Sequence, residues 1–264
     1  MTVRESLRGE PQILAMGGGG FTMEPDNPAL DDFALSLVRV PEPRILFLPT
    51  ASGDPTAQIT SFYARFARRA SATHLSLFRR HGSARSLEDI VLEQDVIYVG
   101  GGSMRNLLAI WRAHELDGLL VEAWRRGIVL AGLSAGAMCW FSGGVTRSSG
   151  PLEVIGGLGL LPGSFTVHAD GEPERLPVWL AAVRSGELPG GWAADDGVGL
   201  LFRGDGLERV VASRPGAVAQ RADAVAGELV RSRIEPELLD AAPSMPVPGE
   251  DIRELRRVLR MRRG

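Results

Sequence analysis

The chain has 264 residues, and its hydrophobic content of 44% is enough to build the core of one large domain. Its formal net charge of -3 gives no general attraction to nucleic acid or to an anionic membrane, so neither partner is expected. All 29 basic residues are arginine, which excludes chemistry that needs a lysine amine, such as a Schiff base or a Walker A loop.

The single cysteine, Cys139, excludes an intramolecular disulfide and a cysteine-rich zinc site, and it fits a reducing compartment. The first residues, MTVRESLRGEPQ, contain no continuous apolar segment of the kind found in a signal peptide. No run of about eighteen apolar residues, the length that a membrane span needs, occurs in the chain. We therefore expect a cytoplasmic protein.

Short apolar runs alternate with helical patterns through the first half of the chain, which indicates a mostly parallel sheet covered by helices on both faces. The predicted helices cover about 56–70, 103–115 and 117–126, and the predicted strands are 13–16, 45–49, 74–78, 96–99 and 128–132. Most of these strands end in glycine or a turn signal. Because ligands bind beyond the carboxyl ends of such strands, the glycine turns predict a site at one rim of the sheet.

The pattern becomes irregular and proline-rich after about residue 150, and strand-like runs return at 198–202, 207–211 and 229–234. These runs predict antiparallel edge strands rather than further βα units. Residues 1–240 are expected to form one catalytic domain, followed by a proline-rich linker at 241–249. The last residues, with six arginines, predict an amphipathic helix that docks on its own domain or on a second subunit of a homodimer; contact with nucleic acid or a membrane is the alternative.

The sequence Gly132-Leu133-Ser134-Ala135-Gly136 lies between a predicted buried strand and a predicted helix. A serine is a poor nucleophile unless it is lifted from the surface, offered to a base and faced by donors for the oxyanion, and a strand-turn-helix elbow provides all three. The N–H of Ala135, and that of Gly101 in the glycine loop after the preceding strand, are the predicted donors. The alternative interpretation is a turn that packs a helix on the sheet.

Four histidines could supply the base, and His168 is the best placed. It follows an apolar run at the end of a strand and opens a loop at the predicted rim, whereas His74, His81 and His114 fit structural or solvated roles. An orienting carboxylate must bond the far imidazole nitrogen. Asp170 is too close in sequence for this, so Asp196 is predicted as the acid, with Asp195 and Glu153 as alternatives.

With these residues in place, the chain resembles peptidase E, the serine peptidase family S51 that includes dipeptidase E and cyanophycinases. The segments that carry the resemblance are QILAMGGGGF, RILFLPTASGD, DVIYVGGGSMRNLL, GIVLAGLSAGAMCW, SFTVHAD and WAADDGVGL. The resemblance implies a flavodoxin-like fold similar to a class I glutamine amidotransferase domain. It also implies Ser134 as nucleophile, His168 as base, and an acid in Asp195-Asp196, where relatives often carry Glu.

The resemblance further implies hydrolysis of small peptides, in particular N-terminal aspartyl dipeptides, with no metal or organic cofactor. Arg175 is expected to bind the substrate carboxylate, and Gly102, Ser103 and Asn106 are expected to line the pocket. The alternatives are a cyanophycinase-like amide hydrolase and a non-hydrolytic binding or regulatory domain on the same scaffold. A glutaminase would need cysteine in place of Ser134, and a dinucleotide-binding loop would need glycine in place of Thr22.

Overall fold

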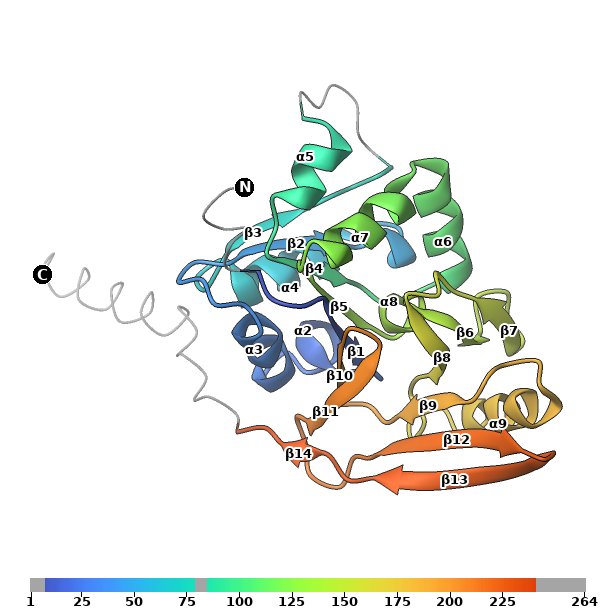
Figure 1. Ribbon diagram of the computed structural model, residues 1–264. Helices are drawn as coiled ribbons and strands as arrows, with labels where there is room; N and C mark the ends of the chain where they lie inside the picture. The colour runs from blue at the N-terminus through green and yellow to red at the C-terminus, as the bar shows by residue number, and fades with distance from the viewer. Residues whose placement is uncertain (1–7, 79–84, 241–264) are drawn as a thin grey trace, which may run out of the picture.

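The computed structural model describes residues 8–78 and 85–240 and contains two β-sheets with helices packed against them (Figure 1). The linker and arginine-rich helix predicted in 241–264, and His81, lie outside these residues. Within the described part of the chain, no helix is both long and apolar enough to cross a membrane.

The first sheet has eight strands in the order β14-β11-β10-β1-β5-β4-β2-β3. Its parallel part consists of β1 (Gln12–Met16), β5 (Val129–Leu133), β4 (Val96–Val99), β2 (Arg44–Leu48) and β3 (Ser71–His74). Antiparallel β10 (Val198–Arg203) and β11 (Gly206–Ala212) extend it, and the short β14 (Glu237–Leu238) closes that edge. The predicted α/β fold with parallel central strands and antiparallel strands near the C-terminus is thereby confirmed.

Alternate residues of the parallel strands point to opposite faces of the first sheet, and each face has its own helices. Leu14 and Met16 pack toward one cluster and Ile13 and Ala15 toward the other. The first cluster is covered by α2 (Gly20–Met23), α3 (Ala29–Ser36) and α4 (Thr56–Phe66). The second is covered by α5 (Leu87–Leu92), α6 (Met104–Ala113), α7 (Leu116–Arg125) and α8 (Ala135–Met138).

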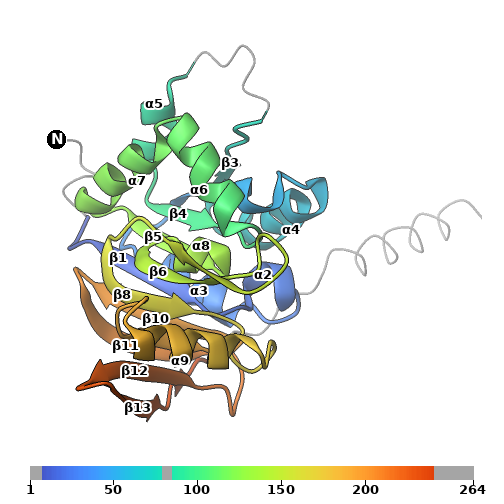
Figure 2. The ribbon, with the colours of Figure 1, turned by 90° about the vertical axis from the view of Figure 1, so that its right-hand side faces the viewer.

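The second sheet, which the sequence did not predict, has the order β13-β12-β9-β8-β6-β7. Its strands are β6 (Phe141–Thr146), β7 (Glu153–Gly156), β8 (Leu161–Thr166), β9 (Gly191–Ala194), β12 (Ala219–Val225) and β13 (Glu228–Ile234). Strands β8 and β9 are parallel and joined by α9 (Arg175–Ser185), which lies along this sheet in Figure 2. The expectation of no further βα unit after residue 150 is therefore wrong. The proline-rich composition of this region did not prevent the helix, because Pro177 stands in its first turn, where the missing N–H has no helical acceptor.

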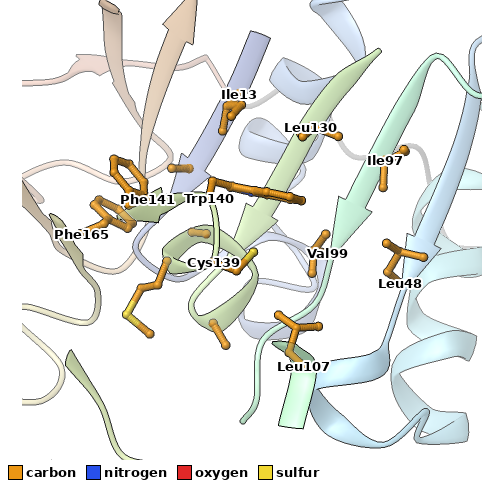
Figure 3. Packing of buried hydrophobic residues seen from close by; sticks show 14 of the residues in the cluster. Ile13, Leu48, Ile97, Val99, Leu107, Leu130, Cys139, Trp140, Phe141 and Phe165 are labelled. Atoms are coloured by element: carbon orange, nitrogen blue, oxygen red, sulfur yellow. The ribbon is translucent and has the colours of Figure 1, made fainter. Parts of the chain in front are cut away.

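Aromatic side chains fill the space between the two sheets (Figure 3). The rings of Phe141 and Phe165 stack with centroids 4.8 Å apart, and Trp140 is fully buried beside them. The Cys139 side chain is also buried in this cluster, and burial raises the pKa of its thiol well above the usual range. This packing fixes the end of β8 relative to the turn after β5.

Most predicted strands of the first sheet match the structure to within a residue, but the one predicted at 74–78 is displaced. The observed strand β3 runs from Ser71 to His74 at the sheet edge, where it pairs with β2 over four residues. Leu75 and Leu77, which produced the strand pattern, are buried in the loop that follows it. Apolar alternation therefore marked burial and not a strand at this position.

Two of the connections that carry the chain between the sheets lie against each other. Residues 195–197 lead from β9 to β10, and residues 213–218 lead from β11 to β12. The N–H of Ser213 donates to the Gly197 carbonyl at 2.8 Å, and the N–H of Asp195 donates to the Val218 carbonyl at 3.1 Å. The predicted acid residues therefore lie where the two sheets meet.

Candidate active site

Ser134 occupies a strained turn between β5 and α8. Its φ of 53° and ψ of -119° form a conformation that costs a side-chain-bearing residue about 1–3 kcal/mol. The turn is closed by glycines, because a Cβ at Gly132 would lie 2.1 Å from the Gly136 carbonyl oxygen, and one at Gly136 would lie 2.4 Å from the Val99 oxygen. The geometry is that of a nucleophile elbow, as the small residues predicted.

His168 lies two residues after the end of β8, and its imidazole reaches Ser134. Its φ of 52° turns the chain sharply, and the turn is held by hydrogen bonds from His168 N–H to the Gly17 carbonyl and from Glu172 N–H to the His168 carbonyl. The Nε2 atom is 2.9 Å from Ser134 Oγ. The two residues thus meet across the junction of the two sheets, with the imidazole largely shielded from solvent.

Asp196 is the carboxylate that the structure brings to His168. Its Oδ1 atom lies 2.5 Å from Nδ1 of the imidazole, the nitrogen opposite the serine. Asp195 points elsewhere, because its buried carboxylate accepts a hydrogen bond from the Val218 N–H at 2.9 Å. Glu153 forms an exposed ion pair with Arg105 at 2.8 Å. Of the three acids left open by the sequence, only Asp196 contacts the imidazole.

Two glycines that the sequence analysis did not single out as site residues leave the space that the Asp196 carboxylate occupies. A Cβ at Gly18 would lie 1.9 Å from Asp196 Oδ1 and 2.9 Å from His168 Nδ1, and a Cβ at Gly171 would lie 2.8 Å from Asp196 Oδ2. The run of glycines at 17–20 suggested a rim loop, but no local signal shows which glycine faces a residue 178 positions later in the chain.

The predicted oxyanion donors lie on either side of the serine. A Cβ at Gly101 would come 3.1 Å from Ser134 Cβ, so this loop packs directly on the nucleophile. The N–H groups of Gly101 and Ala135 have no hydrogen-bond acceptor among the described residues. The helix after the serine is short: α8 is a single turn, and Phe141 begins β6. Stabilisation of an oxyanion here would therefore come from individual N–H groups and not from the dipole of a long helix.

The predicted pocket residues after the glycine loop have separate structural roles. Ser103 caps α6, with its Oγ accepting from the Asn106 N–H at 3.2 Å, and its own N–H donates to the Ala51 carbonyl. Gly102 has a φ of 140° and packs against Ala51, where a Cβ would lie 2.4 Å from the carbonyl oxygen. The Asn106 side chain is exposed. The beginning of α6 is thus fixed next to Gly101.

Arg175 is not available to a substrate in this structure. Its side chain is buried, and Nη1 donates to the Val145 carbonyl at 2.5 Å while Nε and Nη2 donate to Glu172 Oε2 at 3.2 and 2.8 Å. The guanidinium therefore ties α9 to β6. The geometry does not support the carboxylate-binding role expected for Arg175, because its donors already have partners inside the protein.

The other described histidines lie away from Ser134, His74 at the end of the edge strand and His114 at the end of α6. The Tyr63 hydroxyl is 2.8 Å from His74 Nδ1. Among residues 8–78 and 85–240, no three side chains of the usual metal-binding types come together as a cluster.

A buried carboxylate, Asp31, lies close to the glycine loop after β1. It accepts from the Tyr98 hydroxyl at 3.1 Å and pairs with Arg65 Nε at 3.1 Å. Burial raises the pKa of Asp31 to about 7, although Arg65 opposes this change. Because the folded state favours the protonated form, the stability that this group contributes is present at low pH and is lost as the pH rises through about 7.

Comparison with known proteins identifies the family of the chain. The model of peptidase family S51 matches residues 13–210. The protein named "Uncharacterized peptidase YgaJ" from Bacillus subtilis (strain 168) is 51% identical over 211 residues, which cover 80% of this chain and 91% of that protein. The crystal structure of a peptidase from an acI-B1 Actinobacterium has the same fold, with a TM-score of 0.66 and 20% identity over 86% of this chain and 95% of its own. Because the family model spans most of its length, the chain belongs to peptidase family S51 and is a serine peptidase.

Proposed function

We propose that the chain hydrolyses small peptides through an acyl-enzyme, with Ser134, His168 and Asp196 as a catalytic triad. The observation that carries this proposal is the continuous contact from Asp196 Oδ1 to His168 Nδ1 at 2.5 Å and from His168 Nε2 to Ser134 Oγ at 2.9 Å. A carboxylate, an imidazole and a hydroxyl in this order are the parts that serine hydrolases use.

Each group has a defined role in the proposed reaction. His168 Nε2 takes the proton from Ser134 Oγ as the oxygen attacks the scissile carbonyl. The N–H groups of Gly101 and Ala135 donate to the oxyanion that forms, and Asp196 keeps the imidazole in the tautomer that accepts from serine. His168 then protonates the leaving amine, and water activated by the same imidazole releases the acyl group.

An active-site probe tests the nucleophile. A fluorophosphonate is expected to label the folded protein, and labelling is expected to disappear in Ser134→Ala. Ser185→Ala is the matched control, since Ser185 lies at the end of α9 and its hydroxyl donates only to the Ala182 carbonyl. A folded protein that the probe does not label would favour a non-hydrolytic binding domain on this scaffold.

The substrates that we propose are dipeptides with an N-terminal aspartate, as the resemblance to dipeptidase E implies. In place of the buried Arg175, we assign recognition of the substrate carboxylate to Arg105. It lies in the first turn of α6, four residues after Gly101, and its guanidinium pairs with Glu153 on the surface. Exposed pairs of this kind are worth only about 0–1 kcal/mol, so a substrate carboxylate can replace Glu153.

Release of amino acids from a panel of X-Leu dipeptides tests the specificity. Asp-Leu should be cleaved faster than Ala-Leu and Asn-Leu, and Arg105→Ala should lower kcat/KM for Asp-Leu by about 10- to 100-fold, the value of a charged hydrogen bond. Cleavage of Ala-Leu should change little. Arg126→Ala is the control, because Arg126, at the end of α7, also forms an exposed ion pair, with Glu122. Equal rates for Asp-Leu and Ala-Leu would refute the aspartyl specificity while leaving the hydrolase intact. The aspartate–arginine polymer in the same panel tests the cyanophycinase-like alternative.

A further inference from the structure

The main chain of Asp196 is enclosed by two side chains that are not part of the triad. Its N–H donates to Asp170 Oδ1 at 2.9 Å, and its carbonyl accepts from Arg214 Nε at 2.9 Å. The ring closes through an ion pair between Arg214 Nη2 and Asp170 Oδ2. Both polar groups of one peptide residue are thus held by a guanidinium and a carboxylate that also hold each other.

This ring joins three segments that are distant in sequence. Asp170 belongs to the loop that His168 opens, Asp196 to the connection from β9 to β10, and Arg214 to the connection from β11 to β12. The ring therefore links the segment of the base to the segment of the acid. Asp170 is excluded as the orienting acid by its position two residues from His168, and the same position lets it hold the neighbouring connection.

The partners of Asp170 in this ring favour its ionised form. Burial acts to raise the pKa of Asp170, but the hydrogen bond from the Asp196 N–H and the charge of Arg214 outweigh it, so the pKa lies below its usual value. Asp170 is therefore ionised at neutral pH and accepts from both partners. Backbone hydrogen bonds also restrain this turn: the N–H groups of Gly197 and Val198 donate to the carbonyls of Gly18 and Asp195, and the turn is joined to residues 213–218 by the bonds from Asp195 to Val218 and from Ser213 to Gly197.

We propose that Arg214 and Asp170 are positioning residues, which hold the main chain of Asp196 so that its carboxylate stays in contact with His168 Nδ1. The inference rests on the proposed triad and adds the residues that fix its acid. The carboxylate itself is partly exposed, and Gly197 follows it with a φ of 79°, a conformation that glycine adopts freely. Loss of the ring would leave this turn with fewer restraints, and a small displacement of a catalytic group is enough to slow the reaction by orders of magnitude.

The test compares Arg214→Ala with Arg203→Ala. Arg203 on β10 forms two hydrogen bonds with Glu208 on β11. The side chains of the two ion pairs are almost equally exposed: 39% for Arg214 and 37% for Asp170, and 40% for Arg203 and 37% for Glu208. Arg214→Ala is expected to lower kcat by about 10- to 100-fold with KM changed less than about 2-fold. Both variants should keep Tm within a few degrees of the parent, because exposed ion pairs contribute little to stability.

Two readouts separate positioning from a general loss of structure. Guanidinium ion, added far below denaturing concentrations, is expected to restore part of the kcat of Arg214→Ala, since the planar donor can reoccupy the exposed site, and to leave Arg203→Ala unchanged. The low-field proton NMR signal of the His168–Asp196 hydrogen bond should weaken or shift in Arg214→Ala only. Asp170→Asn keeps an acceptor for the Asp196 N–H but loses the charge, so its kcat should fall less than that of Arg214→Ala.

The outcomes distinguish this inference from the proposed function. If the parent protein is active and labelled at Ser134, but Arg214→Ala keeps its kcat and its low-field signal, the positioning role is overturned and the triad stands. A fall in kcat that Arg203→Ala shares to the same extent also overturns it. If the parent protein is neither labelled nor active, the triad fails and this inference fails with it.

Discussion

Replacing Gly18 with alanine would add a methyl group where the Asp196 carboxylate meets His168. The new carbon would lie 1.9 Å from Asp196 Oδ1 and 2.9 Å from His168 Nδ1. Ordinary van der Waals contact begins at 3.4 Å, so the carboxylate oxygen must retreat by about 1.5 Å if the backbone stays in place. A displacement of this size cannot preserve a hydrogen bond that is 2.5 Å long.

The size of the effect follows from the role of the acid. Without an oriented carboxylate the imidazole loses its preferred tautomer, which in serine hydrolases costs up to about 10⁴-fold in kcat. A carboxylate that is displaced but still charged costs less, so we expect Gly18→Ala to lower kcat by about 10²- to 10⁴-fold, or about 3–5 kcal/mol of transition-state stabilisation. Substrate binding should change little, because the methyl group lies behind the imidazole with respect to Ser134.

The assay is turnover of a dipeptide or an activated ester, with the fluorophosphonate labelling rate as a second measure of the nucleophile. Gly118→Ala is the control, because Gly118 lies inside α7 and no atom lies within 4 Å of a Cβ added there. This variant should keep full activity and gain about 0.5–1 kcal/mol in the free energy of unfolding. If Gly18→Ala is folded and its kcat stays within about 3-fold of the parent, then contact between Asp196 and His168 does not govern the reaction.

Three further substitutions test the site and its surroundings. Asp196→Asn should lower kcat by up to about 10⁴-fold, whereas Asp195→Asn should leave kcat almost unchanged; the reverse order would assign the acid to Asp195. Gly101→Ala places a carbon 3.1 Å from Ser134 Cβ, so kcat should fall with little change in KM, and an unaltered kcat would remove this loop from the oxyanion site. Asp31→Asn should remove part of the pH dependence of stability, because the pKa of Asp31 is about 7 in the folded protein against an ordinary 3.8. Between pH 5 and pH 8 the free energy of unfolding of the parent should fall by about 2.5 kcal/mol relative to that of the variant, as measured by urea unfolding. A constant difference across this range would show that Asp31 is not protonated in the folded protein.

The sequence predicted the parts of the fold whose local pattern and tertiary environment agree. Strands β1, β2, β4 and β5 are almost entirely apolar because helices cover both faces of the sheet. The elbow was predictable for the same reason. Gly132 is required by a contact with Gly136, four residues later, so a local motif records it, whereas Gly136 is required by its contact with Val99 on the neighbouring strand.

Features that depend on distant contacts were not predictable from one sequence. Strand β6 contains two glycines and follows a helix of one turn, so neither periodicity nor length marked it as a strand. The position of Arg175 beside the histidine loop suggested a substrate contact, but α9 turns its side chain into the protein. The need for glycine at position 18, and the contact of Arg214 with Asp196, arise only when the two sheets are packed together.

The arrangement of the two sheets also accounts for the order of the triad along the chain. The serine follows β5 of the first sheet, the histidine follows β8 of the second, and the aspartate lies on the connection that returns from the second sheet to the first. The base therefore reaches the nucleophile only when the second sheet is docked, and the acid must come later in the chain, where that connection passes His168. Phe165, three residues before His168, stacks on Phe141. The Phe141 ring in turn contacts Phe202 of the first sheet, with the ring centroids 5.5 Å apart. The aromatic packing between the sheets thus sets the distance between serine and imidazole, and the catalytic geometry depends on this core as much as on the elbow.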